Sequence, residues 1–131
     1  MPEAPTQADI FPMRGLLAAA GTFCLVVLAS PAWSGASTTA TAVGVSEREW
    51  SVALGRLKAP HGRIDLYVHN YGQDDHNLAV RRLGVQYGFT GRIPSGGQKT
   101  LALTLKPGVY NLFCSLPGHR QLGMVATLTV T

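Results

Sequence analysis

Four side chains able to bind a soft metal ion stand out in the second half of the chain. Cys114, His119 and Met124 occur at the spacing Cys-x4-His-x4-Met, and His76 heads an apolar run further upstream. A thiolate and two imidazoles, with a thioether as a weak axial ligand, form the donor set of copper sites that transfer electrons. The residue types and their spacing therefore predict one mononuclear copper site.

Each of these residues, taken singly, has an ordinary structural explanation. A lone buried cysteine usually behaves as a small hydrophobic side chain, and a methionine usually fills a gap in the core. A histidine in a loop is usually solvated, and His76 has the alternative of bonding to a backbone carbonyl inside the core. The combination favours the metal site, because residues 37–131 contain one cysteine and one methionine, and both fall in the same short segment as His119.

Short strands are predicted throughout the part of the chain that carries these residues. Apolar and polar residues alternate with a period of two over residues 50–54, 64–69, 76–81, 101–105, 109–114 and 125–130. This is the pattern of half-buried strands. Turns rich in glycine and proline separate the runs, and residues 84–98 show no clear pattern. Many short strands joined by such turns predict an all-β sandwich or barrel.

The phase of the alternation predicts where the candidate ligands point. His76, Cys114 and Met124 each share a strand face with apolar residues, so their side chains are expected to point inward. His119 follows a Pro-Gly pair in the loop between two strands and is expected near solvent. His61, in a Pro-His-Gly turn, and His69, on the polar face of its strand, are assigned no ligand role.

Residues 1–36 are predicted to be a secretory signal peptide. Arg14 precedes an apolar run over residues 16–29, and Ser34-Gly35-Ala36 fits the small-x-small pattern of a cleavage site. The acidic residues before Met13 do not suit a signal, and a true start at Met13 accounts for them. The apolar run is short for a bilayer span of about 20 residues. An uncleaved membrane anchor is therefore the second interpretation.

Residues 37–45 are predicted to be a flexible linker, and residues 46–131 the folded domain. Export would place this domain in the periplasm or on the extracytoplasmic face of the cell membrane. Cys24 leaves with the signal, so Cys114 becomes an unpaired thiol in an oxidising compartment. Such a thiol has no internal disulfide partner. Metal ligation would explain its presence.

Residues 37–131 are basic, with ten lysines and arginines against five acidic residues and a formal charge of +5. A positive balance favours acidic partners or surfaces through long-range attraction. The basic residues are scattered, however, and no stripe of basic and aromatic residues is present. The sequence therefore argues against nucleic acid as a partner.

Two motifs resemble those of the cupredoxins, the small blue copper proteins of the plastocyanin and auracyanin type. One runs from Pro107 to Cys114 and continues through Pro117-Gly118-His119 to Gly123-Met124; the other is Asp75-His76-Asn77-Leu78. The resemblance covers roughly residues 46–131. It implies a Greek-key β-sandwich preceded by the signal segment, which binds one copper ion that alternates between Cu(I) and Cu(II).

The resemblance also implies a role for each matching residue. His76 and His119 would bind copper through imidazole nitrogens, Cys114 through a short thiolate bond, and Met124 as the weak axial ligand. The backbone N–H of Asn77 would contact the thiolate, and its side chain would join neighbouring loops. The ordinary alternative for Asn77 is a polar residue at a strand edge.

The family further implies a docking surface for redox partners. Its loop histidine protrudes through an apolar patch, which here would comprise Leu116, Pro117 and Leu122 around His119. Weak redox encounters use small interfaces, at the low end of about 1,200 Å², so transient docking of a monomer is expected. Arg120 at the rim either favours an acidic partner or is an exposed arginine without a role.

A one-electron carrier is the function that the sequence favours. A copper module for trafficking or storage is the main alternative, because the same four ligands would serve it. An enzyme is disfavoured, since a copper oxidase or nitrite reductase needs a further metal centre, and protease and hydrolase signatures are absent. A metal-free sandwich with a structural role would leave Cys114 unexplained.

Overall fold

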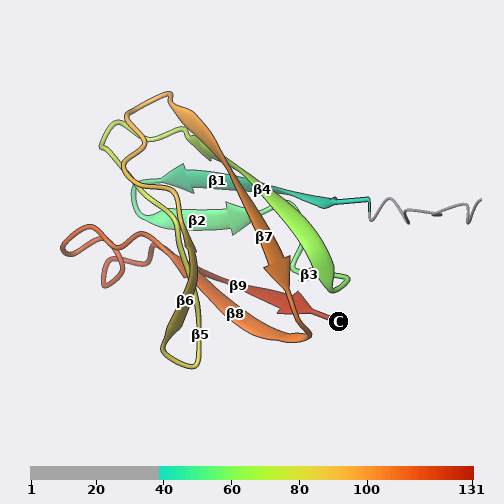
Figure 1. Ribbon diagram of the computed structural model, residues 1–131. Coiled ribbons are helices and arrows are strands. Elements are labelled where there is room, and N and C mark those ends of the chain that lie inside the picture. Colours follow the sequence, from blue (N-terminus) through green and yellow to red (C-terminus); the bar gives the residue numbers. More distant parts are fainter. Residues whose placement is uncertain (1–38) are drawn as a thin grey trace, which may run out of the picture. The chain divides into compact units, whose positions relative to one another are not determined.

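The computed structural model describes residues 39–131, which form two β-sheets packed against each other (Figure 1). The first sheet has the strand order β2-β1-β4-β7. Its strands are β1 (Thr41–Arg48), β2 (Ser51–Leu54), β4 (Gly62–Asn70) and β7 (Gln98–Leu105). β1 pairs in parallel with β4, whereas β1 with β2 and β4 with β7 are antiparallel.

The second sheet has the strand order β3-β9-β8-β5-β6. Its strands are β3 (Lys58–Ala59), β5 (Ala79–Arg82), β6 (Val85–Phe89), β8 (Gly108–Phe113) and β9 (Val125–Val130). β3 and β9 run parallel, and the other pairs are antiparallel. The predicted all-β sandwich is thus confirmed. Among the described residues, no helix is long and apolar enough to cross a membrane.

The core lies between the sheets and is built from the inward positions of the alternating strands. From Ile64 to Asn70 every second residue of β4 is buried, and inward positions of β1 and β8 are buried in the same way. Burying one Val, Leu or Ile side chain contributes about 1.5–3 kcal/mol. The largest fully buried apolar side chains include Ile64, Leu66, Leu78, Tyr110, Leu112 and Leu128.

Three predictions about the strands need correction. The linker was expected to reach residue 45, but residues 41–45 belong to β1, with Val43 and Val45 in the core. β6 was not expected, because four of its five residues are exposed at the sheet edge and show no buried phase. Trp50 was expected inside a strand, but it lies in the turn before β2. The predicted signal segment, residues 1–36, falls outside the described residues.

Three connections meet at one end of the sandwich: the β1–β2 turn, the segment between β4 and β5, and the loop between β8 and β9. Figure 1 shows the orange-red β8–β9 loop on the same side as the β1–β2 turn. The β4–β5 segment is anchored by a bridge in which His76 and Ile93 exchange backbone hydrogen bonds of 3.0 and 2.7 Å. The candidate ligands come from the second and third of these connections.

Candidate metal centre

The structure brings three of the four candidate ligands to a single point. The ligand atoms of His76, Cys114 and His119 all lie within 4.8 Å of one another. Nδ1 of His119 is 3.2 Å from Nδ1 of His76 and 3.6 Å from Sγ of Cys114. His76 and Cys114 are fully buried, whereas His119 is partly exposed. The cluster therefore has an enclosed side and one imidazole that reaches the surface.

The β8–β9 loop is closed by its own backbone, which fixes the relative places of three candidates. The N–H of Cys114 donates to the carbonyl of Met124 over 3.1 Å, and the N–H of Met124 donates to the carbonyl of His119 over 3.1 Å. Met124 is fully buried and belongs to the same core cluster as Cys114. Gly123 permits the close approach of the β1–β2 turn, since a Cβ there would lie 2.9 Å from the carbonyl oxygen of Trp50.

His76 is oriented by a carboxylate that the sequence did not suggest. Its Nε2 lies 3.1 Å from Oε1 of Glu49, and the same oxygen accepts the backbone N–H groups of Gln73 and Asp74, each at 2.8 Å. The hydrogen bond from the Asp74 backbone is the main cause that lowers the pKa of Glu49 below its usual value. An ionised carboxylate can only accept a hydrogen bond, so Nε2 of His76 carries the hydrogen and donates it, and Nδ1 is left with its lone pair.

Asn77 joins the β4–β5 segment to the β8–β9 loop. Its side-chain Oδ1 accepts hydrogen bonds from the backbone N–H of Ser115, at 2.7 Å, and from the Ser115 hydroxyl, at 3.0 Å. Asn77 itself is buried. Because Ser115 directly follows Cys114, these bonds hold the thiol-bearing segment against the part of the β4–β5 segment that contains His76.

Burial raises the pKa of the Cys114 thiol above its ordinary value. Hydrogen bonding by the backbones of Leu116 and Asn77 lowers it, and repulsion from the Glu47 carboxylate raises it further. Without metal the thiol is therefore held in its neutral form. Because a metal binds the thiolate, metal binding would release the proton of this group.

Glu47 is a buried acid near this site that the sequence reasoning also missed. It occupies an inward position of β1 and is fully buried, and neither carboxylate oxygen has a hydrogen-bond partner among residues 39–131. Burial raises its pKa to about 7. Its position in β1, two residues after Val45, was the available signal, and it was hidden because residues 41–45, the first part of β1, had been interpreted as linker.

The predicted docking residues surround His119 unevenly. Leu122 is 56% exposed and Pro117 is exposed, but Leu116 is half-buried and packs against the core. Trp50, which is 39% exposed, was not predicted at this surface, yet its ring meets the His119 ring edge-on with centroids 4.9 Å apart. Its place in the chain gave no sign of this contact.

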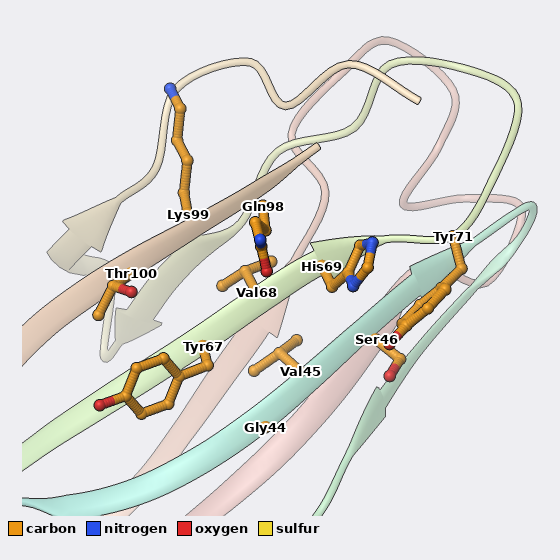
Figure 2. Close-up of a pocket in the computed structure, with 10 residues that line it drawn as sticks. All are labelled: Gly44, Val45, Ser46, Tyr67, Val68, His69, Tyr71, Gln98, Lys99 and Thr100. Carbon is orange, nitrogen blue, oxygen red and sulfur yellow. The ribbon is translucent and has the colours of Figure 1, made fainter. Parts of the chain in front are cut away.

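The two remaining histidines lie elsewhere. Nδ1 of His61 is 3.0 Å from the carbonyl oxygen of Thr131. His69 stacks on Tyr71 with ring centroids 3.8 Å apart. Figure 2 shows the rings of His69 and Tyr71 beside an open groove over β1, β4 and β7. The groove has a volume of about 390 Å³. The cluster of ligand atoms consists of His76, Cys114 and His119, so neither His61 nor His69 belongs to it.

The clustered donors fit copper by their chemistry. Two imidazoles and a thiolate are borderline and soft donors, and within residues 39–131 no carboxylate belongs to the cluster of ligand atoms. Magnesium and calcium prefer oxygen ligands, whereas thiolate with imidazole suits copper or zinc. A buried methionine, Met124, is bonded through its backbone to both loop candidates. A thioether is the donor that distinguishes a copper electron-transfer site from a zinc site.

Comparison with known proteins agrees with this assignment. Residues 56–131 match the family described as copper binding proteins, plastocyanin/azurin family. No curated protein sequence matches the chain.

Three solved structures illustrate the likeness of the fold. Rusticyanin from Thiobacillus ferrooxidans has a TM-score of 0.62 and 19% identity, covering 72% of this chain and 79% of its own. An azurin from Methylomonas sp. strain J has a TM-score of 0.57 and 16% identity, with coverages of 72% and 99%. Auracyanin from Roseiflexus castenholzii has a TM-score of 0.55 and 18% identity, with coverages of 72% and 98%. With its matching sequence, its two-sheet fold and its cluster of sulfur and nitrogen donors, the chain belongs to the plastocyanin/azurin family of copper-binding proteins, and its cofactor is one copper ion.

Proposed function

We propose that this protein is an exported type 1 copper protein that carries single electrons between redox partners and is not an enzyme. The observation that carries the proposal is the convergence of His76, Cys114 and His119 within 4.8 Å, with His119 alone reaching the surface. Met124 is proposed as the axial ligand. Copper, when bound, supplies a reversible one-electron change.

The chain contributes rigidity and an exit for the electron. His76 and Cys114 are anchored by the Ile93 bridge and by Asn77, so little rearrangement of the ligands is possible when the charge changes. Full burial of both side chains excludes water from that side of the site. His119 connects the buried donors to the surface, so a partner docked there comes close to the metal without entering the core.

The proposed docking surface combines the predicted patch with one added residue. Leu122, Pro117 and Leu116 lie on the β8–β9 loop, and Trp50 covers one side of the His119 ring. An exposed apolar surface of this kind supports brief docking driven by removal of water, as weak redox complexes require. A monomer that meets its partners transiently is the form we propose.

Two arginines next to the loop favour an acidic partner. The guanidinium carbons of Arg120 and Arg81 lie 4.2 and 5.6 Å from the ring centroid of Phe113, the residue before Cys114. They line a hollow of about 300 Å³ that Cys114, Leu116 and Pro117 also border. Positive charge beside the proposed electron exit would attract a partner with an acidic face and orient it toward the loop.

Export is proposed from the sequence pattern of residues 1–36, together with the single unpaired cysteine of the domain. The destination would be the periplasm or the outer face of the cell membrane. Fractionation of cells that express the full-length chain, followed by mass determination of its N-terminus, tests this. A product that starts at residue 37 supports export, whereas a cytoplasmic product with an intact N-terminus contradicts it.

The spectrum and voltammetry of the copper-loaded full-length chain test the function. The oxidised protein should show an intense visible thiolate-to-copper charge-transfer band and a reversible one-electron wave. Cys114→Ala should abolish the band. His69→Ala is the matched control, because His69 is outside the cluster, and it should leave the band unchanged. A protein that binds copper but shows no reversible wave would favour trafficking or storage instead.

A further inference from the structure

We propose that Glu49 is an anionic positioning residue for the copper site, which holds the Nε2–H of His76 and lowers the reduction potential of the bound copper. This inference rests on the proposed function. Glu49 is not itself a ligand candidate, because the ligand atoms that converge belong to His76, Cys114 and His119. It acts through the far side of one imidazole.

The carboxylate of Glu49 is held in place from three directions. Oε1 accepts the backbone N–H groups of Gln73 and Asp74 at 2.8 Å each, and it faces Nε2 of His76 at 3.1 Å. The Glu49 side chain is 27% exposed, whereas the His76 side chain is fully buried. A buried imidazole thus meets a carboxylate that is already fixed by the backbone, which is stronger than a contact between two mobile side chains.

Gly72 supplies a second, independent sign that the chain accommodates this carboxylate. A Cβ at position 72 would overlap Oε1 of Glu49 and would lie 2.7 Å from its Cδ and Oε2. Gly72 is buried, and its own N–H donates to Oδ1 of Asn70 over 2.8 Å. The absence of a side chain at residue 72 therefore leaves the space in which the carboxylate of Glu49 lies.

The first consequence concerns the tautomer of His76. With its hydrogen on Nε2 and directed at Glu49, the ring presents the lone pair of Nδ1 toward His119, whose Nδ1 is 3.2 Å away. A hydrogen bond on one ring nitrogen decides which nitrogen binds metal. Glu49 therefore prepares His76 for binding before any metal arrives.

The second consequence concerns the oxidation state. A negative charge on the far side of the imidazole increases the basicity of the donor nitrogen. Cu(II) carries one more positive charge than Cu(I), so it gains more from this added electron density. The carboxylate therefore stabilises the oxidised form more than the reduced form, and the reduction potential falls.

A purely structural role is the competing explanation, since Glu49 also braces the loop through Gln73 and Asp74. Glu49→Gln separates the two roles, because the amide oxygen still accepts hydrogen bonds but carries no charge. In the copper-loaded full-length chain, we expect the ratio of Cu(II) to Cu(I) affinity to fall about tenfold, which raises a one-electron potential by about 59 mV. Asp74→Asn is the control: it removes the same charge from an exposed neighbour and should change the ratio less than twofold.

Gly72→Ala is the complementary variant: it keeps the charge of Glu49 but displaces its carboxylate from His76. It should also raise the potential. In the copper-free protein, ¹⁵N NMR should show the Nε2–H tautomer of His76 in the wild type and in Glu49→Gln, and a mixture of tautomers in Gly72→Ala. This second readout needs no copper, so it is independent of whether the protein transfers electrons.

The outcomes separate the two proposals. If Glu49→Gln shifts the potential no more than Asp74→Asn does, the charge of Glu49 has no specific effect on the copper and the inference is wrong. The inference is also wrong if His76 adopts the same tautomer in Gly72→Ala as in the wild type. If the wild type shows no charge-transfer band although the tautomer responds as expected, the proposed function fails and the positioning role of Glu49 stands.

Discussion

The indole of Trp50 meets the imidazole of His119 edge-on, with ring centroids 4.9 Å apart and an interplanar angle of 82°. The two residues come from opposite sheets of the sandwich, since one precedes β2 and the other lies between β8 and β9. The contact restrains the one imidazole of the cluster that reaches the surface. It also places an aromatic ring, 39% exposed, beside the proposed electron exit.

Replacing Trp50 by Ala should slow electron exchange between oxidised and reduced molecules of this protein. The variant loses the indole from the docking surface. An aromatic contact between the two docked molecules is worth about 0.5–1.5 kcal/mol, so the rate should fall about twofold to tenfold. The self-exchange rate is measured by NMR line broadening in mixtures of the two oxidation states. Tyr67→Ala removes a ring of 52% exposure from another surface and should leave the rate unchanged. Equal rates in all three proteins would exclude Trp50 from the docking surface.

Reversing the charge of Arg120 should weaken the reaction with anionic oxidants. Hexacyanoferrate(III) is a suitable probe, because it needs no identified protein partner. At low ionic strength Arg120→Glu should react severalfold more slowly, and the difference should shrink as salt shortens the Debye length to about 8 Å at 0.15 M. Arg56→Glu makes the same change in net charge at an exposed residue beyond β2 and should have the smaller effect. A loss that persists at high salt would point to altered structure rather than to steering.

Replacing Met124 by Gln should retain copper but lower its reduction potential. The amide oxygen is a harder donor than the thioether and favours Cu(II). Voltammetry of the loaded protein measures the shift, and the visible spectrum reports whether the thiolate bond is kept. Leu128→Met is a control for repacking of the core, because Leu128 is also fully buried. It should leave the potential near the wild-type value. An unchanged potential in Met124→Gln would contradict axial ligation.

Glu47 should make the copper-free protein less stable as the pH rises. Its pKa is 4.5 ordinarily and about 7 in the folded protein, where burial opposes ionisation. Between these values the folded state binds more protons than the unfolded state, so the free energy of unfolding falls with rising pH. The loss attributable to Glu47 is on the order of 3 kcal/mol and is complete above about pH 7.

Urea unfolding of the wild type and of Glu47→Gln at pH 5 and pH 8 measures this loss. Every other titrating group is common to both proteins, so the difference between their pH dependences isolates Glu47. The variant should lose less stability than the wild type between the two pH values. Parallel dependences would show that the Glu47 carboxyl titrates normally.

The sequence predicts most of the fold because nearly every strand buries one face. β4 is the clearest case, since Ile64, Leu66 and Val68 alternate with more exposed neighbours. β6 could not be predicted for the opposite reason: most of its residues are exposed at the sheet edge, so no alternation of buried and exposed residues marks the strand. β1 was cut short because its two buried valines follow a stretch of serine, threonine and alanine that resembles a linker.

The candidate ligands could be predicted because their side-chain chemistry is scarce in this chain. A single cysteine and a single methionine after residue 36 leave few alternatives. The contacts of Glu47, Glu49 and Trp50 could not be predicted, because neither a glutamate near the end of a strand nor a Glu-Trp pair in a turn indicates a neighbouring metal site. Their roles arise from contacts across the sandwich: Glu49 is 27 residues from His76 in sequence. Only the packing of the two sheets reveals such contacts.

Glu49 and Trp50 are consecutive, yet each touches a different imidazole of the cluster. This turn precedes residue 56, where the match to the copper-binding family begins. The part of the chain that matches the family model therefore contains the candidate donors, whereas the two residues that we propose to set the reduction potential and to extend the docking surface lie before it. A substitution of Trp50 that is meant to change the choice of redox partner would therefore have to leave Glu49 in place. If Glu49 moved, the reduction potential of the copper would change together with the partner.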